Sequence, residues 1–212
     1  MKPKRGKKAL KTIAEKFRDE IKRIDSVISE INLNLEEVKA IELISRMGFV
    51  YLMTYLEAFN REYFIKFFSE NPHIMAKPLK NKKDQKKLVM EYKNLVEEIY
   101  GIESDLSEKM AVKLYNEVFD YYSLDINTFI SKLLEGFLEL DFHNESERRG
   151  IDINILKRFR DIRNSIIHYK EVYFKEDISF RKCHNIIIEY ITLVEELIYN
   201  KYYSQKNHWY DI

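Results

Sequence analysis

The sequence predicts an all-α fold, and three observations support this prediction. Hydrophobic residues make up 45% of the 212 residues and charged residues 33%, which supplies both a core and a solvated surface. Only five Gly and three Pro are present to break helices. Apolar residues recur at steps of three and four along most of the chain, which is the period of an amphipathic helix. We therefore expect residues 1–212 to form a single domain, a helical bundle with long antiparallel helices.

Two long helices are predicted in the first third of the chain. Residues 8–31 carry apolar side chains on one face, whereas residues 35–68 are apolar nearly all round at their centre. The second segment should therefore be the central helix, with Gly48 allowing a neighbour to come close. Residues 1–8 form a basic arm, which we expect to be solvated and partly disordered; contact with RNA phosphates or an anionic membrane is the alternative.

The next segment, residues 69–83, contains Pro72, Pro78 and several lysines, and it predicts a loop. Its lysines form a candidate electrostatic footprint for a phosphate backbone, in which we single out Lys82 and Lys83. A solvated charged loop is the alternative. Shorter helices are predicted after this loop at residues 88–100, 107–122 and 125–138. The polar residues 141–150 predict a connecting segment.

Residues 155–170 predict an amphipathic helix, with Asp152 or Asn154 as its N-cap. A buried apolar stripe is predicted along one face, at Ile155, Phe159, Ile162, Ile166 and Tyr169. A polar stripe is predicted one turn apart on another face, at Arg160, Asn164 and His168. This geometry keeps the histidine out of the core.

Arg163 lies on the flank of the polar stripe, beside Leu156 and Ile167. Both apolar residues fall outside the predicted buried stripe, so we expect them to be exposed and to form a dimer seam next to the polar residues. The last helix, from Asp177 onwards, has a strong apolar face. We expect it to pack against the preceding helix as an antiparallel neighbour.

The pattern Arg163-Asn164-x-x-x-His168 resembles the motif of HEPN domains, Arg-x(4–6)-His on a late helix, often with a polar residue directly after the Arg. The resemblance implies a helical bundle that dimerises so that two motif helices face each other. Many members are metal-independent endoribonucleases, while others have lost catalysis and only bind. Residues 55–59 (Tyr-Leu-Glu-Ala-Phe) carry a second, softer resemblance to an early helix of some members, where an acidic residue precedes a small and an aromatic one.

These residue types suit RNA cleavage without a metal, because the nucleophile, the 2′-OH, is already in the substrate. His168 offers a proton acceptor or donor near neutral pH, and Arg163 offers a planar cation for two phosphate oxygens. Asn164 would orient the imidazole or bind phosphate. We assign catalytic roles to Arg163, His168 and Asn164, and substrate binding to Arg160, Lys157, Lys82 and Lys83. An acid and a base on opposite sides of the phosphorus require two groups, which two motif helices across a twofold axis would supply.

The expected function is therefore an endoribonuclease of a toxin, phage-defence or stress system. Its expected partners are RNA, a second copy of the chain, and an antitoxin or regulatory protein. The alternative is a non-catalytic module that binds nucleotide, RNA or a partner protein. We expect no cofactor and no metal, since the sequence has neither a Gly-rich phosphate loop nor Cys/His metal spacing.

Composition limits the remaining possibilities. The 36 basic and 35 acidic residues nearly cancel, so any nucleic-acid site must be a local patch. The single cysteine, Cys183, excludes an internal disulfide and predicts a buried filler. The basic N-terminus is followed by no apolar signal-peptide core, and the longest apolar run, residues 47–56, is about half a bilayer span. We expect a cytoplasmic protein with no membrane contact.

Overall fold

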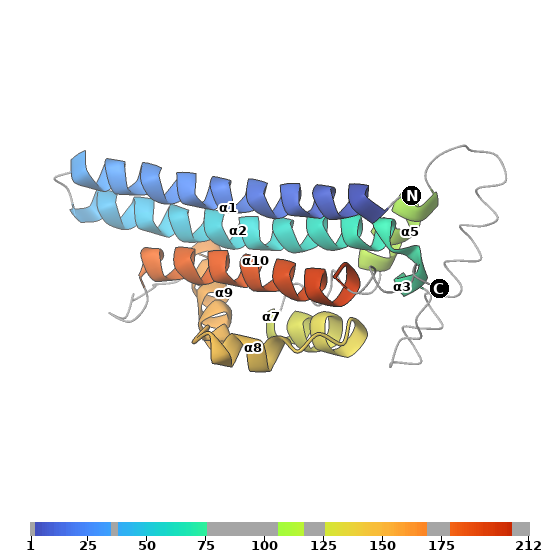
Figure 1. Cartoon of the computed structure of the whole chain (residues 1–212). Coiled ribbons are helices and arrows are strands. Elements are labelled where there is room, and N and C mark those ends of the chain that lie inside the picture. Colours follow the sequence, from blue (N-terminus) through green and yellow to red (C-terminus); the bar gives the residue numbers. More distant parts are fainter. Residues whose placement is uncertain (1–2, 35–37, 76–105, 117–125, 169–178, 205–212) are drawn as a thin grey trace. The chain divides into compact units, whose positions relative to one another are not determined.

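The computed structural model describes residues 3–34, 38–75, 106–116, 126–168 and 179–204. Every regular element in this part of the chain is a helix, so the predicted all-α class is confirmed. The elements, labelled in Figure 1, are α1 (Pro3–Asn34), α2 (Val38–Glu70), α3 (Pro72–Met75), α5 (Leu106–Leu114), α7 (Ile126–Phe129), the π-helix η2 (Ile130–Phe137), α8 (Phe142–Arg148), α9 (Ile153–Ile167) and α10 (Phe180–Tyr202). No helix within these described ranges has the length and apolarity needed to cross a membrane.

The chain divides into two compact units. We call the first the motif unit; it comprises Thr12–Phe59 and His143–Glu196, and it contains α8, α9 and large parts of α1, α2 and α10. The second, which we call the terminal unit, comprises Met1–Lys11, Asn60–Phe142 and Leu197–Ile212. The single domain over residues 1–212 stays a prediction.

Within the motif unit, α1 and α2 pack against each other in opposite directions. The Phe17 ring lies 6.0 Å from the Tyr55 ring and 5.7 Å from the Phe59 ring, both edge-on. Near the other end of the pair, a Cβ added to Gly48 would collide with Ile28 of α1 and Phe180 of α10. The long antiparallel helices are thus confirmed for this pair, and so is the close approach that Gly48 was expected to allow.

Helix α10 runs parallel to α2 in the motif unit. Phe49 of α2 lies 6.1 Å from Phe180 of α10, and Phe59 lies 6.5 Å from Tyr190, so the contacts advance along both helices together. Figure 1 shows α9 lying across the direction of α10 instead of alongside it. The expectation that α9 and α10 are antiparallel neighbours is therefore wrong, because α9 packs crosswise on the parallel pair.

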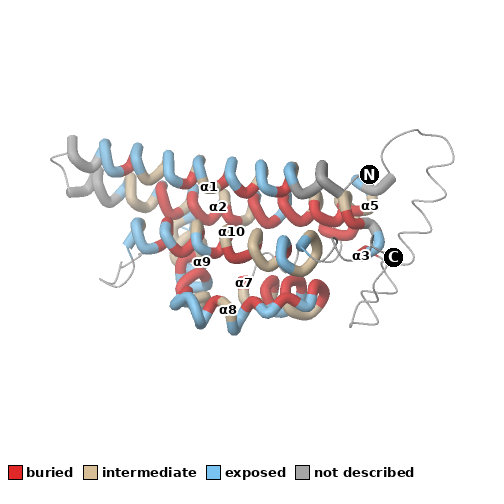
Figure 2. Tube along the Cα trace, in the orientation of Figure 1, coloured by how far each residue is buried: buried red, intermediate tan, exposed pale blue. Residues whose placement is uncertain are grey.

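The core of the motif unit comes from all of its long helices. Figure 2 shows that buried and exposed residues alternate along both α1 and α2, and α2 carries more of the buried ones. The centre of α2 was expected to be buried on several sides, but Leu43, Met47 and Tyr51 are exposed. Cys183 is fully buried, and this burial raises the pKa of its thiol well above the usual value. A buried thiol with a raised pKa is protonated at neutral pH, which confirms the predicted filler role.

Aromatic rings hold the terminal unit together. Phe64 lies 5.7 Å from Phe129 of α7, and Phe68 lies 5.9 Å from Phe137 of η2. The Tyr202 hydroxyl donates to the Leu138 carbonyl at 2.8 Å, and burial raises the pKa of Tyr202 to about 12. Tyr202 therefore packs against the connection after η2.

Several predicted boundaries need correction. Helix α1 begins at Pro3, so residues 3–8 are helical and not a disordered arm. The polar residues 141–150 were predicted as a connection, but most of them form α8. An ion pair between Arg148 and Glu145, 2.7 Å apart on this helix, supports it. The predicted loop 69–83 contains the short helix α3, and its remainder lies outside the described residues together with the predicted helix 88–100.

Candidate functional site

Helix α9 carries the predicted motif, and its start is fixed as expected. The Asp152 side chain accepts a hydrogen bond from the Asn154 backbone N–H at 3.0 Å, which makes Asp152 the N-cap. The helix was predicted to continue to Lys170, but it ends at Ile167, and His168 is its C-cap with φ −90° and ψ 16°. The His168 N–H still donates to the Asn164 carbonyl at 3.0 Å, so the last turn holds the histidine at the helix end.

The first half of α9 is anchored by apolar packing. Ile155, Leu156 and Phe159 are buried, and the Phe159 ring lies 5.9 Å from the Phe49 ring of α2. Leu156 was expected to be exposed at a dimer seam, and it is completely buried instead. Because α9 crosses the other helices, they cover a wider arc of its surface than one stripe. Ile167, the other seam residue, is 46% exposed as expected.

Arg163 is the best-defined polar group of the motif. One terminal nitrogen donates to the Glu57 carboxylate of α2 at 2.8 Å, and the other donates to the Asn164 side-chain oxygen at 2.9 Å. The Arg163 and Glu57 side chains retain 20% and 28% of their exposure. The Arg163 Nε is buried and has no hydrogen-bond partner within the described part of the chain. The guanidinium is thus held in one orientation, with two of its five N–H donors engaged.

Glu57 was not among the predicted site residues, although the sequence held a signal for it. It is the acidic residue of the segment 55–59, the softer of the two resemblances to HEPN proteins. The structure joins that segment to the motif through the ion pair, across 106 positions of sequence. The Asn164 side-chain oxygen accepts a hydrogen bond from Arg163, and its predicted role of orienting the imidazole or binding phosphate stays a prediction.

The other predicted site residues are placed as follows. Arg160 is partly buried, with 17% of its side chain exposed, and pairs with Asp161 at 3.0 Å. Lys157 and His168 are exposed on the surface of the same helix. Lys82 and Lys83 lie outside the described residues. The described motif therefore combines a fixed arginine on the flank of α9 with an exposed histidine at its end.

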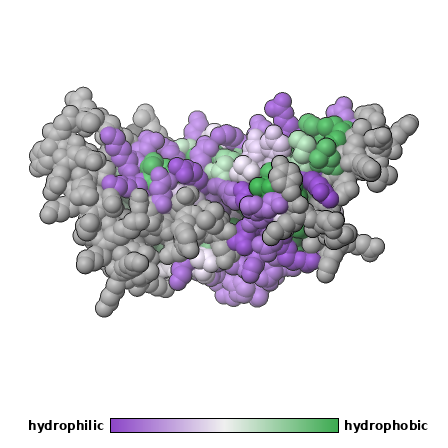
Figure 3. All heavy atoms as spheres, turned by 180° about the vertical axis from the view of Figure 1, so that it is seen from behind, coloured by the Kyte–Doolittle hydropathy of each residue, from purple (hydrophilic) through white to green (hydrophobic). Residues whose placement is uncertain are grey.

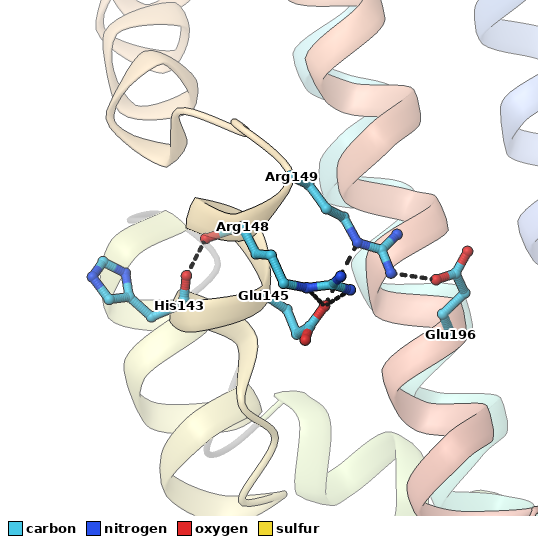
Figure 4. A network of polar contacts seen from close by, with 6 residues as sticks. His143, Glu145, Arg148, Arg149 and Glu196 are labelled. Atoms are coloured by element: carbon cyan, nitrogen blue, oxygen red, sulfur yellow. Dashed lines mark hydrogen bonds and ion pairs between the residues drawn. The ribbon is translucent and has the colours of Figure 1, made fainter.

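A second polar network links the end of α8 to α10, and Figure 4 shows its residues. Arg148 donates to Glu145 at 2.7 Å, and this hydrogen bond lowers the pKa of the Glu145 carboxyl. Arg149 donates to Glu196 of α10 at 2.6 Å. Gly150 then turns the chain towards α9 with φ +68°, a conformation that favours glycine. These charges pair with each other, so we assign the network a structural role in joining the end of α8 to α10.

Within the part of the chain that the structure describes, metal ligands do not gather at the motif. Among the described residues, His, Cys, Asp and Glu side chains form no group of three or more that could hold a metal ion.

Comparisons with known proteins place the chain in no family. No family model matches it, and no solved structure matches it. One curated protein, the transcription elongation factor GreA of Borreliella burgdorferi (strain ATCC 35210 / DSM 4680 / CIP 102532 / B31), is 38% identical over 64 residues. These residues are 30% of this chain and 7% of that protein, so the similarity is local and the chain spans only a small part of the relative's length.

Proposed function

We propose that the chain is a metal-independent endoribonuclease of the HEPN type, acting in the cytoplasm. The observation that supports this proposal best is the arrangement on α9, where Arg163 is oriented by Glu57 and Asn164 while His168 is exposed at the helix end. A fixed cation can stabilise the charge that builds up on the non-bridging oxygens of a phosphate. An exposed imidazole can exchange a proton near neutral pH.

In the proposed reaction, the 2′-oxygen of the RNA attacks the adjacent phosphorus and its proton passes to one His168 imidazole. The bond from phosphorus to the 5′-oxygen breaks, and that oxygen takes a proton from a second imidazole. The products carry a 2′,3′-cyclic phosphate and a 5′-hydroxyl. This step requires neither water nor a metal ion, and Arg163 remains a positively charged phosphate ligand throughout.

The second imidazole is proposed to come from another copy of the chain. Arg163 and His168 are five residues apart, so their side chains leave a helix about 140° from each other. Within one copy, His168 is therefore poorly placed to reach a phosphate that is bound at Arg163. A homodimer in which two α9 helices meet near the exposed Ile167 would supply an acid and a base from opposite sides.

RNA binding is proposed to extend beyond the reacting phosphate. Arg160 and Lys157 lie on α9 with the motif, and Lys82 and Lys83 would add contacts to the backbone. These groups supply binding that weakens with salt, because each phosphate contact releases counterions. We further propose a toxin, phage-defence or stress role, in which an antitoxin or regulatory protein covers the site.

A non-catalytic binding module is the second candidate, and the Arg163–Glu57 pair itself favours it. A guanidinium that already has a carboxylate at 2.8 Å must release or share it before it can bind phosphate through the same nitrogen. A protein with such a pair could bind RNA, nucleotide or a protein without stabilising a transition state.

The deciding experiment uses a defined RNA in excess EDTA with the purified protein. We expect cleavage, with 2′,3′-cyclic phosphate and 5′-hydroxyl ends detected by end-specific labelling. A matched RNA with 2′-O-methyl at the cleaved nucleotide should remain intact, because its nucleophile is blocked. Equal cleavage of both RNAs, or inhibition by EDTA, would show that the proposed reaction is wrong. Binding of both RNAs without cleavage would favour the second candidate.

A further inference from the structure

The hairpin of α1 and α2 has an exposed apolar face that the proposed reaction does not use. Its members are large apolar residues with roughly a third to two thirds of their surface in solvent: Val27 (48%), Ile31 (36%), Leu43 (60%), Met47 (52%) and Tyr51 (55%). We call these five residues the hairpin face. All of them belong to the motif unit, and each is four residues from the next on its own helix. That spacing aligns them in one row on α1 and one on α2.

Both rows point to the same side of the hairpin. Arg18 reaches Glu195 of α10 at 2.6 Å, and Val27, nine residues further along α1, lies about half a turn round the helix from it. On α2, Phe49 contacts Phe159 and Phe180, and Met47 lies about 200° round the helix from Phe49. Both rows therefore face away from α9 and α10.

The two rows are also level with each other along the hairpin. Ile28 lies beside Gly48, and the two helices run in opposite directions. Ile31, one turn further along α1, is then level with the turn between Leu43 and Met47. Figure 3, which views the molecule from behind, shows hydrophobic side chains gathered over the hairpin at the upper right. The five residues thus form one continuous surface instead of scattered exposed side chains.

We propose that this face binds the same face of a second copy of the chain. The charges beside it are of both signs, since Glu20 and Arg23 on the same side of α1 retain 40% and 77% of their side-chain exposure. Their nearest charged atoms are 4.0 Å apart, so they form a weak pair within one chain and can exchange partners across a twofold axis. RNA or an anionic membrane would instead select a uniformly basic rim.

The size of the face also fits self-association. Five large, half-exposed apolar side chains give one copy a patch of a few hundred Å², near the upper range for a monomer. Two copies together, with their charged rims, approach the roughly 1,000 Å² that a specific interface needs. This interface is separate from the proposed contact at Ile167, so two different twofold interfaces would build an assembly larger than a dimer.

Light scattering of purified variants at micromolar concentration tests the inference separately from the proposed reaction. Met47→Glu places a charge in the centre of the hairpin face and should halve the molar mass of the wild-type assembly. Ser29→Glu, an exposed position of α1 on the other side of Ile28, is the matched control and should leave the mass unchanged. Circular dichroism with unchanged helicity and melting temperature establishes that each variant is folded.

The two interfaces give distinct results. If Ile167→Glu halves the mass and Met47→Glu does not, the hairpin inference is overturned while the composite catalytic site stands. If Met47→Glu halves the mass and Ile167→Glu has no effect, the hairpin interface is supported and the composite site fails. A wild-type protein that is monomeric at these concentrations overturns the hairpin interface.

Discussion

The two halves of α9 are held by different kinds of interaction. In the first half, Ile155, Leu156 and Phe159 are buried against other helices of the motif unit. In the second half, Arg163 is held by a charged hydrogen bond to Glu57, and His168 ends the helix in solvent. Apolar burial is worth roughly 2 kcal/mol per large side chain, while a partly exposed ion pair is worth about 1 kcal/mol or less.

The two halves of α9 therefore have different roles: the first half positions the helix, and the second half carries the proposed catalytic residues. The buried half fixes where α9 lies, because moving it would expose several large side chains to water. The polar half contributes little to stability, so its residues can be changed while the fold is retained. Substitutions in the two halves should therefore affect different measurements, and four predictions test this division.

The largest expected effect is on cleavage, from His168→Ala. Loss of the proton carrier should lower the rate constant for cleavage of a defined RNA by about a thousandfold, the usual range for a general acid or base. The melting temperature should not change, because His168 is exposed at the end of α9. His143→Ala removes another exposed histidine of the motif unit and should retain full activity. If both variants were equally active, His168 would have no catalytic role.

The next largest effect is on stability, from Leu156→Ala. Leu156 is completely buried, so its truncation should lower the free energy of unfolding by about 3 kcal/mol. Ile167→Ala is the matched control on the same helix, and it should change this free energy by less than about 1 kcal/mol because Ile167 is half-exposed. Urea unfolding followed by circular dichroism measures both. Equal losses in the two variants would contradict the burial difference between them.

The sequence predicted that α9 exists, how it begins and which way its apolar stripe faces. It did not predict how wide the buried surface of α9 is. The period of apolar residues located the stripe through Ile155 and Phe159, and Asp152 was a recognisable cap. Leu156 was misplaced because the period gives the direction of burial, whereas the arc that is covered depends on how neighbouring helices cross. That crossing is a tertiary property, which also explains why α10 was wrongly expected to lie antiparallel to α9.

The resemblance in residues 55–59 pointed to Glu57, but the sequence could not show that Glu57 pairs with Arg163, for a related reason. Arg163 and Glu57 are 106 residues apart, and no spacing rule connects positions on two different helices. The long helices were predictable within a few residues, as α2 illustrates, because their signals are local, whereas the short helix α8 was missed. Which polar side chains meet is decided only when the helices pack.

A smaller effect on cleavage is expected from Arg163→Lys. Lysine keeps the positive charge but cannot hold Glu57, Asn164 and a phosphate with one rigid plane of donors. The cleavage rate constant at saturating RNA should fall by about thirtyfold, equivalent to about 2 kcal/mol of transition-state stabilisation. The dissociation constant for RNA should change by less than about threefold, since the charge remains. Single-turnover kinetics separate the two quantities, and a loss confined to binding would argue against a role in the transition state.

The smallest expected effect comes from Glu57→Gln, which keeps the shape and one acceptor but removes the charge that faces Arg163. Stability should fall by about 1 kcal/mol or less, because both side chains are partly exposed and solvent screens the pair.

The effect on RNA is the more informative measurement. If Glu57 mainly orients the guanidinium, RNA should bind slightly tighter while the cleavage rate constant falls, because the cation is less engaged but also less fixed. If Glu57 instead mainly occupies the guanidinium, binding and cleavage should both increase. Glu62→Gln, an exposed carboxylate of the same helix, provides the control for the change in net charge. Parallel dissociation constants and single-turnover rates for the two variants distinguish these outcomes, and identical values for both variants would show that the pair with Arg163 affects neither step.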